Sequence, residues 1–160
     1  MSKKEDRLAS LPDGIHEGLI DELWSCEGVE EFFHKYEADG INKRIAGVPF
    51  IDYHLYKSME AHNEICSAVL LVKKKVQGIL ILAKEFHTHY NEIIAEIDSL
   101  YVVPEYRAAW GRKMLACAEF AARRWGAKAL VLNAKYDDEK TNRLFSFYAE
   151  PASISYWKTL

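Results

Sequence analysis

The sequence predicts one α/β domain in which helices flank a central mixed β-sheet. Three features indicate this class: a helical N-terminal third, two apolar β-branched runs arranged as a hairpin, and a later strand–helix–strand unit. A hairpin pairs its strands antiparallel, whereas a strand–helix–strand crossover makes its two strands parallel. The sheet should therefore be mixed, and ligands tend to bind where neighbouring strands stop pairing uniformly.

Length and composition are those of a single globular domain. The chain has 160 residues, of which 49% are hydrophobic and 28% charged, as in ordinary soluble proteins. The formal net charge of −3 argues against a broad nucleic-acid interface. Three scattered cysteines without a CxxC pair argue against a disulfide framework, and no apolar run is long enough to span a bilayer. We expect a cytoplasmic protein with no membrane partner, a flexible tail over residues 1–14 and one domain over 15–160.

The N-terminal third is predicted to be helical. Apolar residues recur at helical spacing from Ile15 to Tyr36, which indicates one kinked helix or two short ones interrupted near Cys26–Gly28. Gly40–Phe50 is expected to form a loop. Asp52 is then expected to cap a helix that runs to about Asn63.

The rest of the chain alternates between strands and helices. Three lysines separate the strands of the hairpin, Pro104 ends the long third strand, and Gly126 ends the helix that follows it. The fourth strand is continuously apolar, so both of its faces should be buried. The predicted strands are Ile65–Lys73, Val76–Phe86, Ile93–Val103, Ala129–Asn133 and Ser153–Lys158, and the predicted helices are Gly111–Trp125 and Asp137–Tyr148.

The segment from Val103 to Leu115 has the features of an anion site. A strand runs into a short loop of small and basic residues, and a helix begins at once. The first turn of a helix offers free N–H groups and the positive end of the helix dipole. A pyrophosphate fits such a site, although an ordinary loop with solvated basic residues is an alternative. The residues expected to bind the anion are Arg107, Ala108, Ala109, Trp110, Gly111, Arg112 and Lys113.

The same segment resembles the acetyl-CoA segment of the GNAT acetyltransferase superfamily. Residues 100–107 read LYVVPEYR, and the family shows a strand ending in LYV followed by P-x-Y-R-G-x-G-x-G and a helix. The resemblance covers most of the chain, and the final SYWKTL resembles the ending of short GNAT proteins of bacteriophages and bacteria. It implies a GNAT-like fold and an N-acetyltransferase that moves an acetyl group directly from acetyl-CoA to an amine within a ternary complex. The acceptor is either a small molecule or a protein. A homodimer is a further possibility that the sequence does not decide.

The loop departs from the family pattern. Ala108, Ala109 and Trp110 replace most of its glycines, and the loop is one residue shorter between Arg107 and Gly111. Alanine fits only where φ is negative, and an indole is bulky beside a pyrophosphate. We expect Trp110 to point away into the apolar layer. The alternative is a GNAT scaffold without turnover that acts as a binding or regulatory protein, encoded by a phage and directed at its host.

The resemblance also implies catalytic groups. A carboxylate should deprotonate the acceptor ammonium, and Glu96 and Asp98 lie on one strand at a spacing that puts them on the same face. The alternative is two charges on the exposed face of an edge strand. Backbone N–H groups at Leu100, Tyr101 and Val102 would polarise the thioester oxygen.

Three further residues follow from the family pattern. Residues 142–148 resemble the family's N-x-x-A-x-x-F-Y, which makes Tyr148 the candidate that protonates the departing thiolate. A different alignment sets Tyr148 at the family's glycine and favours a packing role. Asn133 and Asn142 are candidates for bonding the pantetheine amides, or else are turn or cap residues.

Two other patterns are interpreted as structural. His87 and His89 lack a third ligand at useful spacing, so no metal site is predicted. Cys117 lies among alanines in the middle of a predicted helix, which favours a small buried residue over a nucleophile.

Overall fold

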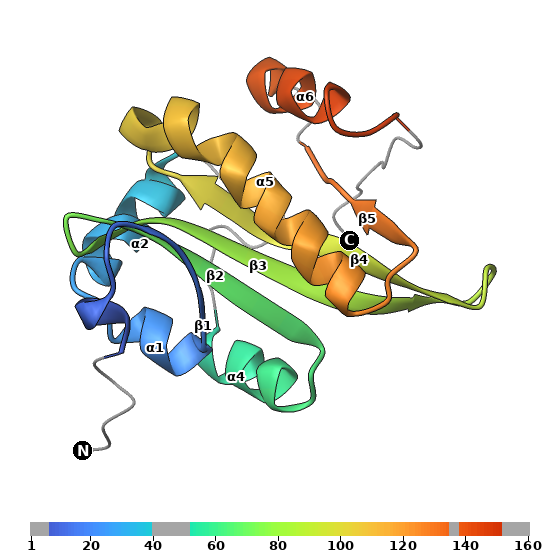
Figure 1. Cartoon of the computed structure of the whole chain (residues 1–160), viewed down its shortest axis with the longest axis horizontal. Helices are drawn as coiled ribbons and strands as arrows, with labels where there is room; N and C mark the ends of the chain where they lie inside the picture. Colours follow the sequence, from blue (N-terminus) through green and yellow to red (C-terminus); the bar gives the residue numbers. More distant parts are fainter. Residues whose placement is uncertain (1–6, 40–51, 135–137, 152–160) are drawn as a thin grey trace, which may run out of the picture.

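A five-stranded sheet forms the centre of the protein (Figure 1). The computed structural model describes residues 7–39, 52–134 and 138–151. The strands stand in the sheet in the order of the chain. The first four are antiparallel to their neighbours, whereas β4 and β5 are parallel, which confirms the predicted mixed sheet. The strands are β1 (Gly14–Gly18), β2 (Ile65–Val72), β3 (Lys75–His87), β4 (Glu92–Val102) and β5 (Ala129–Val131).

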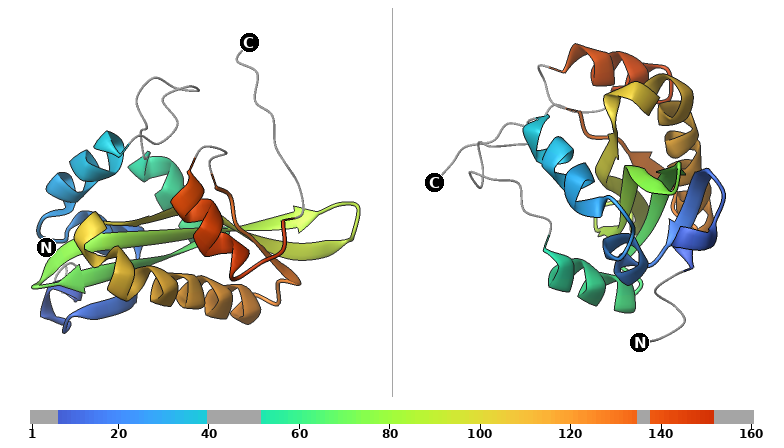
Figure 2. Two further views of the ribbon diagram at one scale, coloured as in Figure 1. Left: turned by 90° about the horizontal axis from the view of Figure 1, so that it is seen from above. Right: turned by 90° about the vertical axis from the view of Figure 1, so that its left-hand side faces the viewer.

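Helices cover both faces of the sheet, as Figure 2 shows. One face carries α1 (Ile20–Trp24), α2 (Val29–Ala38) and α4 (Tyr53–Ala61), and the other carries α5 (Arg107–Arg124) with α6 (Glu139–Ser146) beside it. The 3₁₀ helices are η1 (Leu8–Ser10) and η2 (Pro104–Tyr106). Among the described helices, none combines the length and the apolar character needed to cross a membrane.

The core has one apolar layer on each side of the sheet. The predicted stripe of α5 is confirmed, because Met114, Leu115 and Ala118 are fully buried against the sheet. On the opposite face, Phe32 of α2 packs edge-on against Tyr101 of β4, with ring centroids 5.5 Å apart. Such aromatic contacts add to the stabilisation from buried area alone. Helices therefore pack against β4 on both faces of the sheet.

The hairpin of β2 and β3 is confirmed, with its turn at the predicted lysines. Lys73 and Lys74 take positive φ values of 52° and 64°, as a two-residue hairpin turn requires. Gly78 lies where three strands meet, and a Cβ there would stand 3.1 Å from the Tyr101 carbonyl oxygen. A larger residue at this position would require the β4 backbone to shift by a few tenths of an ångström.

The first part of the predicted N-terminal helix is wrong, because residues 14–18 form β1. This strand pairs with β2, for example His16 with Val69, so long-range pairing overrides the helical spacing of the sequence. The predicted interruption near Gly28 is confirmed, since Gly28 has φ 79° and caps α2.

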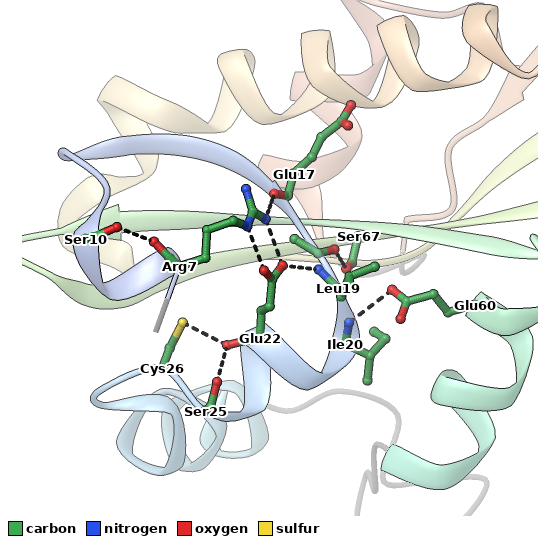
Figure 3. A network of polar contacts seen from close by, with 11 residues as sticks. Arg7, Ser10, Glu17, Leu19, Ile20, Glu22, Ser25, Cys26, Glu60 and Ser67 are labelled. Atoms are coloured by element: carbon green, nitrogen blue, oxygen red, sulfur yellow. Dashed lines mark hydrogen bonds and ion pairs between the residues drawn. The ribbon is translucent and has the colours of Figure 1, made fainter. Parts of the chain in front are cut away.

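Within the expected tail, the described residues from Arg7 onward contact the rest of the protein. Leu8 is 1% exposed in the core, and the Arg7 side chain reaches back to Glu22 of α1 (Figure 3). Arg7 Nη2 also donates to the Glu17 carbonyl of β1 at 2.8 Å. These contacts join the start of the chain to the sheet and to the first helix.

The C-terminal elements are shorter than predicted. β5 ends at Val131 and not at Asn133, and it is only half-buried because it pairs with β4 alone in the described part of the chain. The expectation that both of its faces are buried is therefore wrong. Helix α6 begins after Asp138, whose side chain caps it by accepting from the Thr141 N–H at 3.0 Å. The Asp52 cap of α4 is confirmed. The predicted loop Gly40–Phe50 and the predicted strand Ser153–Lys158 lie outside the described residues.

Candidate active site

β4 loses its parallel neighbour halfway along its length. In the described residues, β4 pairs with β5 only from Ile94 to Glu96, whereas its pairing with β3 continues to Val102. Beyond Glu96, this edge of β4 is therefore open as far as the described residues go. The Val103 N–H bonds to the Gln77 carbonyl on the β3 side. Because successive residues of a strand alternate in direction, the N–H groups of Leu100 and Val102 face the open edge, and that of Tyr101 faces β3.

The predicted loop after β4 is helical, and the prediction that the helix begins at Gly111 is wrong. The chain passes through η2 directly into α5, which begins at Arg107. Pro104 starts this turn with a φ suited to a helix, and the alanines that follow are strong helix formers. Ala108 and Ala109 therefore have helical, negative φ values, so replacing the family's glycines introduces no backbone strain. Both are exposed at the first turn of α5.

Arg107 is bound within the protein. Its Nε donates to the Val102 carbonyl at 2.7 Å, and its Nη2 forms an ion pair of 2.6 Å with Asp39. The guanidinium also lies over the Tyr101 ring, 5.2 Å from its centroid. Arg107 thus fixes the junction between β4 and α5. Arg112, which is exposed one turn further on, is the better placed of the two to contact an anion.

Trp110 packs into the apolar layer beneath α5 and α6. It is half-buried and belongs to the same cluster as Met114, Leu144 and Phe145. The Lys113 ammonium lies 4.2 Å from its ring centroid, a favourable cation–π distance. The indole is therefore a packing residue, while Gly111 is half-buried beside it.

Glu96 is half-buried, and at this residue β4 is paired with a strand on each side. The alternative of a charge on an exposed edge strand is therefore excluded for Glu96. Its Oε1 accepts a hydrogen bond from Asn133, which follows β5. Its partner across the sheet is Ala83, on the face covered by α4. Burial, followed by the negative charge of Glu85, raises the pKa of the Glu96 carboxyl above its ordinary value, and the bond from Asn133 partly offsets this. A carboxylate with a raised pKa is a better proton acceptor.

Asp98 lies at an irregularity of β4. Ile81 pairs with Ser99 and Leu82 with Ile97, so Asp98 is the extra residue of a β-bulge. Its Oδ2 accepts from the Tyr56 hydroxyl of α4 at 2.6 Å and from the Ser99 hydroxyl at 3.1 Å. Bulges often redirect side chains next to active sites.

Two tyrosines, one from α2 and one from α4, form hydrogen bonds at this bulge. The Tyr36 hydroxyl of α2 donates to the Ser99 hydroxyl at 3.3 Å, so a continuous chain of hydrogen bonds joins α2, β4 and α4. Sequence reasoning missed Tyr36 and Tyr56. The local signal was a tyrosine on the inner side of an amphipathic helix, but only the tertiary structure shows which strand it contacts.

The remaining predicted residues lie near α6. The Tyr148 hydroxyl donates to the Arg112 carbonyl of α5 at 3.2 Å, and the residue is 37% exposed. Asn142 donates from Nδ2 to the Asp138 carbonyl at 2.9 Å within the first turn of α6. Tyr148 therefore lies against the second turn of α5, while Asn142 supports the start of α6.

The chain belongs to the acetyltransferase (GNAT) family, which residues 19–147 match. Members of this family are acetyltransferases that typically use acetyl-CoA. The comparison with curated proteins found no match.

Solved structures of several differently named proteins share this fold. An aminoglycoside acetyltransferase from an uncultured soil sample is 16% identical with TM-score 0.71, and the alignment covers 92% of this chain and 95% of that one. A ribosomal-protein-alanine N-acetyltransferase from Brucella melitensis is 15% identical with TM-score 0.62, covering 92% and 99%. A transcriptional regulator from Bacillus halodurans is 16% identical with TM-score 0.71, covering 93% and 99%. At these identities the similarity is one of fold.

Proposed function

We propose that this acetyltransferase moves an acetyl group from acetyl-CoA directly to an amine, with Glu96 as the general base. The observation that carries this proposal is the position of Glu96. It is half-buried, has a raised pKa, and lies where β4 separates from β5. The open edge of β4 and the exposed first turn of α5 adjoin each other. Together they offer N–H groups to the thioester and a positive helix end to the pyrophosphate of acetyl-CoA.

Each part of this site has a distinct task. Acetyl-CoA supplies an activated acetyl thioester. The N–H groups of Leu100 and Val102 stabilise the negative charge that develops on the thioester oxygen. The first turn of α5 and the charges of Arg112 and Lys113 attract the pyrophosphate.

Proton transfer completes the reaction. An ammonium cannot attack a carbonyl, so Glu96 first accepts a proton from the acceptor nitrogen. The departing thiolate then needs a proton, and Tyr148, held against α5, is the candidate donor. Asn133 orients the Glu96 carboxylate, and Tyr56 holds Asp98 beside it.

The acceptor is expected to be a cationic amine. Three carboxylates, Glu85, Glu96 and Asp98, act on one another electrostatically on the face of the sheet that α4 covers. A positively charged substrate would relieve this repulsion. One structural neighbour is named as an aminoglycoside acetyltransferase, and aminoglycosides are polycationic amines of this chemical class.

Calorimetry with acetyl-CoA tests the binding step. We expect a one-to-one complex that weakens as salt rises, because salt screens the attraction between the pyrophosphate and the basic groups. Arg112→Ala should lower affinity by about 1–3 kcal/mol if it removes a charge-assisted contact. Arg123→Ala, which removes a similar charge from the far end of α5, is the matched control and should change affinity little.

A chain that binds no acetyl-CoA at millimolar concentration would contradict the proposal. Binding without any acetylation across a panel of polyamines, aminoglycosides and peptide N-termini would favour the alternative, a GNAT-fold binding or regulatory protein.

Trp110→Gly tests whether the indole obstructs the co-substrate. Because Trp110 packs in the layer beneath α5 and α6, its removal should cost about 2–4 kcal/mol of stability. The affinity for acetyl-CoA should stay within a few-fold of the original. A tenfold gain in affinity, about 1.4 kcal/mol, with unchanged stability would show instead that the indole covers the site. Thermal denaturation and calorimetry on this single variant distinguish the two outcomes.

A further inference from the structure

A pocket of about 250 Å³ lies between the sheet and α5. Strands β1, β2 and β3 form one wall and the middle of α5 forms the other. Small side chains make the hollow, namely those of Cys66, Ala68, Ala116, Cys117 and Ala121. The pocket is on the α5 face, whereas Glu96 is on the face covered by α4. It is therefore separate from the proposed acetyl-transfer site.

The polar groups that line this pocket are already bonded. The Glu17 carboxylate at the rim forms an ion pair of 2.8 Å with Arg124, and the Ser67 hydroxyl donates to the Gly18 carbonyl at 2.7 Å. Arg124 also lies over the ring of Phe120, 5.9 Å from its centroid. Ordered water needs two to four polar partners, and this lining supplies few. The pocket therefore favours an uncharged apolar occupant over water or an ion.

The two thiols act as apolar walls and not as nucleophiles. Burial raises the pKa of Cys66 to about 11, and burial likewise raises the pKa of Cys117. Both groups are thus protonated at neutral pH, and a protonated thiol behaves as a small hydrophobic side chain. Binding in the pocket should therefore be non-covalent.

We propose that this pocket is a binding site for a small uncharged apolar molecule about the size of an alkylbenzene. The volume sets the size of the ligand. An apolar cavity of about 150 Å³ in another protein accepts benzene, and about 250 Å³ here accommodates a ring with a short alkyl substituent. Burial of the ligand's apolar surface supplies the driving force.

Toluene and the two pocket thiols provide the test. Saturation-transfer NMR should show saturable toluene binding to the full chain. At mildly alkaline pH the small thiolate fraction of each group reacts slowly with N-ethylmaleimide. Toluene should slow this alkylation of Cys66 and Cys117 about fivefold or more, as followed by peptide mass spectrometry. Cys26 is buried in a different cluster, so its alkylation should not change. This readout needs no variant and no acetylation assay.

A pair of alanine variants locates the site. Ala116 is exposed on α5 at the pocket, so Ala116→Leu should fill the space without disturbing the helix and should abolish toluene binding. Ala61→Leu, at the exposed end of α4, is the control and should bind as before. Failure of the original chain to bind toluene, thiols that react equally fast with and without it, or undiminished binding by Ala116→Leu would each overturn the proposal.

Discussion

Glu96→Gln is expected to lower kcat by about 10²- to 10⁴-fold, the usual contribution of a general base. Glutamine keeps the shape of the side chain and its contact with Asn133 but cannot accept the substrate proton. The affinity for acetyl-CoA should stay nearly unchanged, because Glu96 lies on the sheet face opposite α5, whose first turn is proposed to bind the pyrophosphate. Steady-state kinetics with an active amine and calorimetry with acetyl-CoA measure the two effects separately.

Two neighbouring carboxylates serve as controls for this result. Asp98→Asn should reduce kcat much less, since Asp98 is already engaged by Tyr56 and Ser99. Glu85→Gln should leave the maximal rate nearly intact but shift its pH dependence. Equal and small effects of Glu96→Gln and Asp98→Asn would show that both carboxylates only hold the substrate.

The sign of the pH shift follows from the charge of Glu85. A general base works only when it is deprotonated, so kcat/KM should rise with pH through the pKa of Glu96 and then level off. Glu85 contributes to raising that pKa. Removing its charge lowers the pKa, and the rising limb of the profile should move to lower pH. A limb that moves to higher pH, or does not move, would exclude this assignment of the base.

Arg7→Ala is expected to lower the free energy of unfolding by about 2–3 kcal/mol. Its guanidinium holds both oxygens of Glu22, with Nε–Oε1 2.6 Å and Nη2–Oε2 2.7 Å (Figure 3). The Glu22 side chain is only 5% exposed, whereas that of Arg7 is 49% exposed. The variant would remove the Arg7 guanidinium from a buried carboxylate, which keeps its hydrogen bond from the Leu19 N–H at 2.8 Å. The half-exposed position of Arg7 also limits the cost. Urea denaturation measures the difference.

Arg123→Ala is the matched control for Arg7→Ala. Arg123 pairs with Glu119 one turn away on the surface of α5, where both side chains are well exposed. Such pairs contribute about 0.3–0.5 kcal/mol. If both variants cost the same at neutral pH, the N-terminal segment is not held by this ion pair.

The elements that the sequence predicted well are those with strong local signals. The hairpin of β2 and β3 has continuous β-branched runs around a lysine turn, and α5 has an apolar stripe at helical spacing. β1 lacks such a signal, because Gly14–Gly18 contains two glycines and only one large apolar residue. It becomes a strand because β2 offers it a pairing edge.

The start of α5 illustrates a different source of error. The family pattern suggested a glycine-rich loop between Val103 and Gly111, but this chain carries Arg107, Ala108 and Ala109, which are good helix formers. Local propensity was the better guide here. The same residues that weakened the resemblance to the family loop are those that extend the helix.

The sequence by itself determined the family, the mixed sheet, and Glu96 as the candidate base, because these rest on local patterns and on spacing along one strand. Only the tertiary structure decided that Tyr36 and Tyr56 meet at the Asp98 bulge, that Arg107 bonds to the protein itself, and that Cys66 and Cys117 share a pocket. These contacts join residues far apart in the chain. Their geometry depends on how the helices pack on the sheet, and that packing is a property of the whole core and not of any one segment.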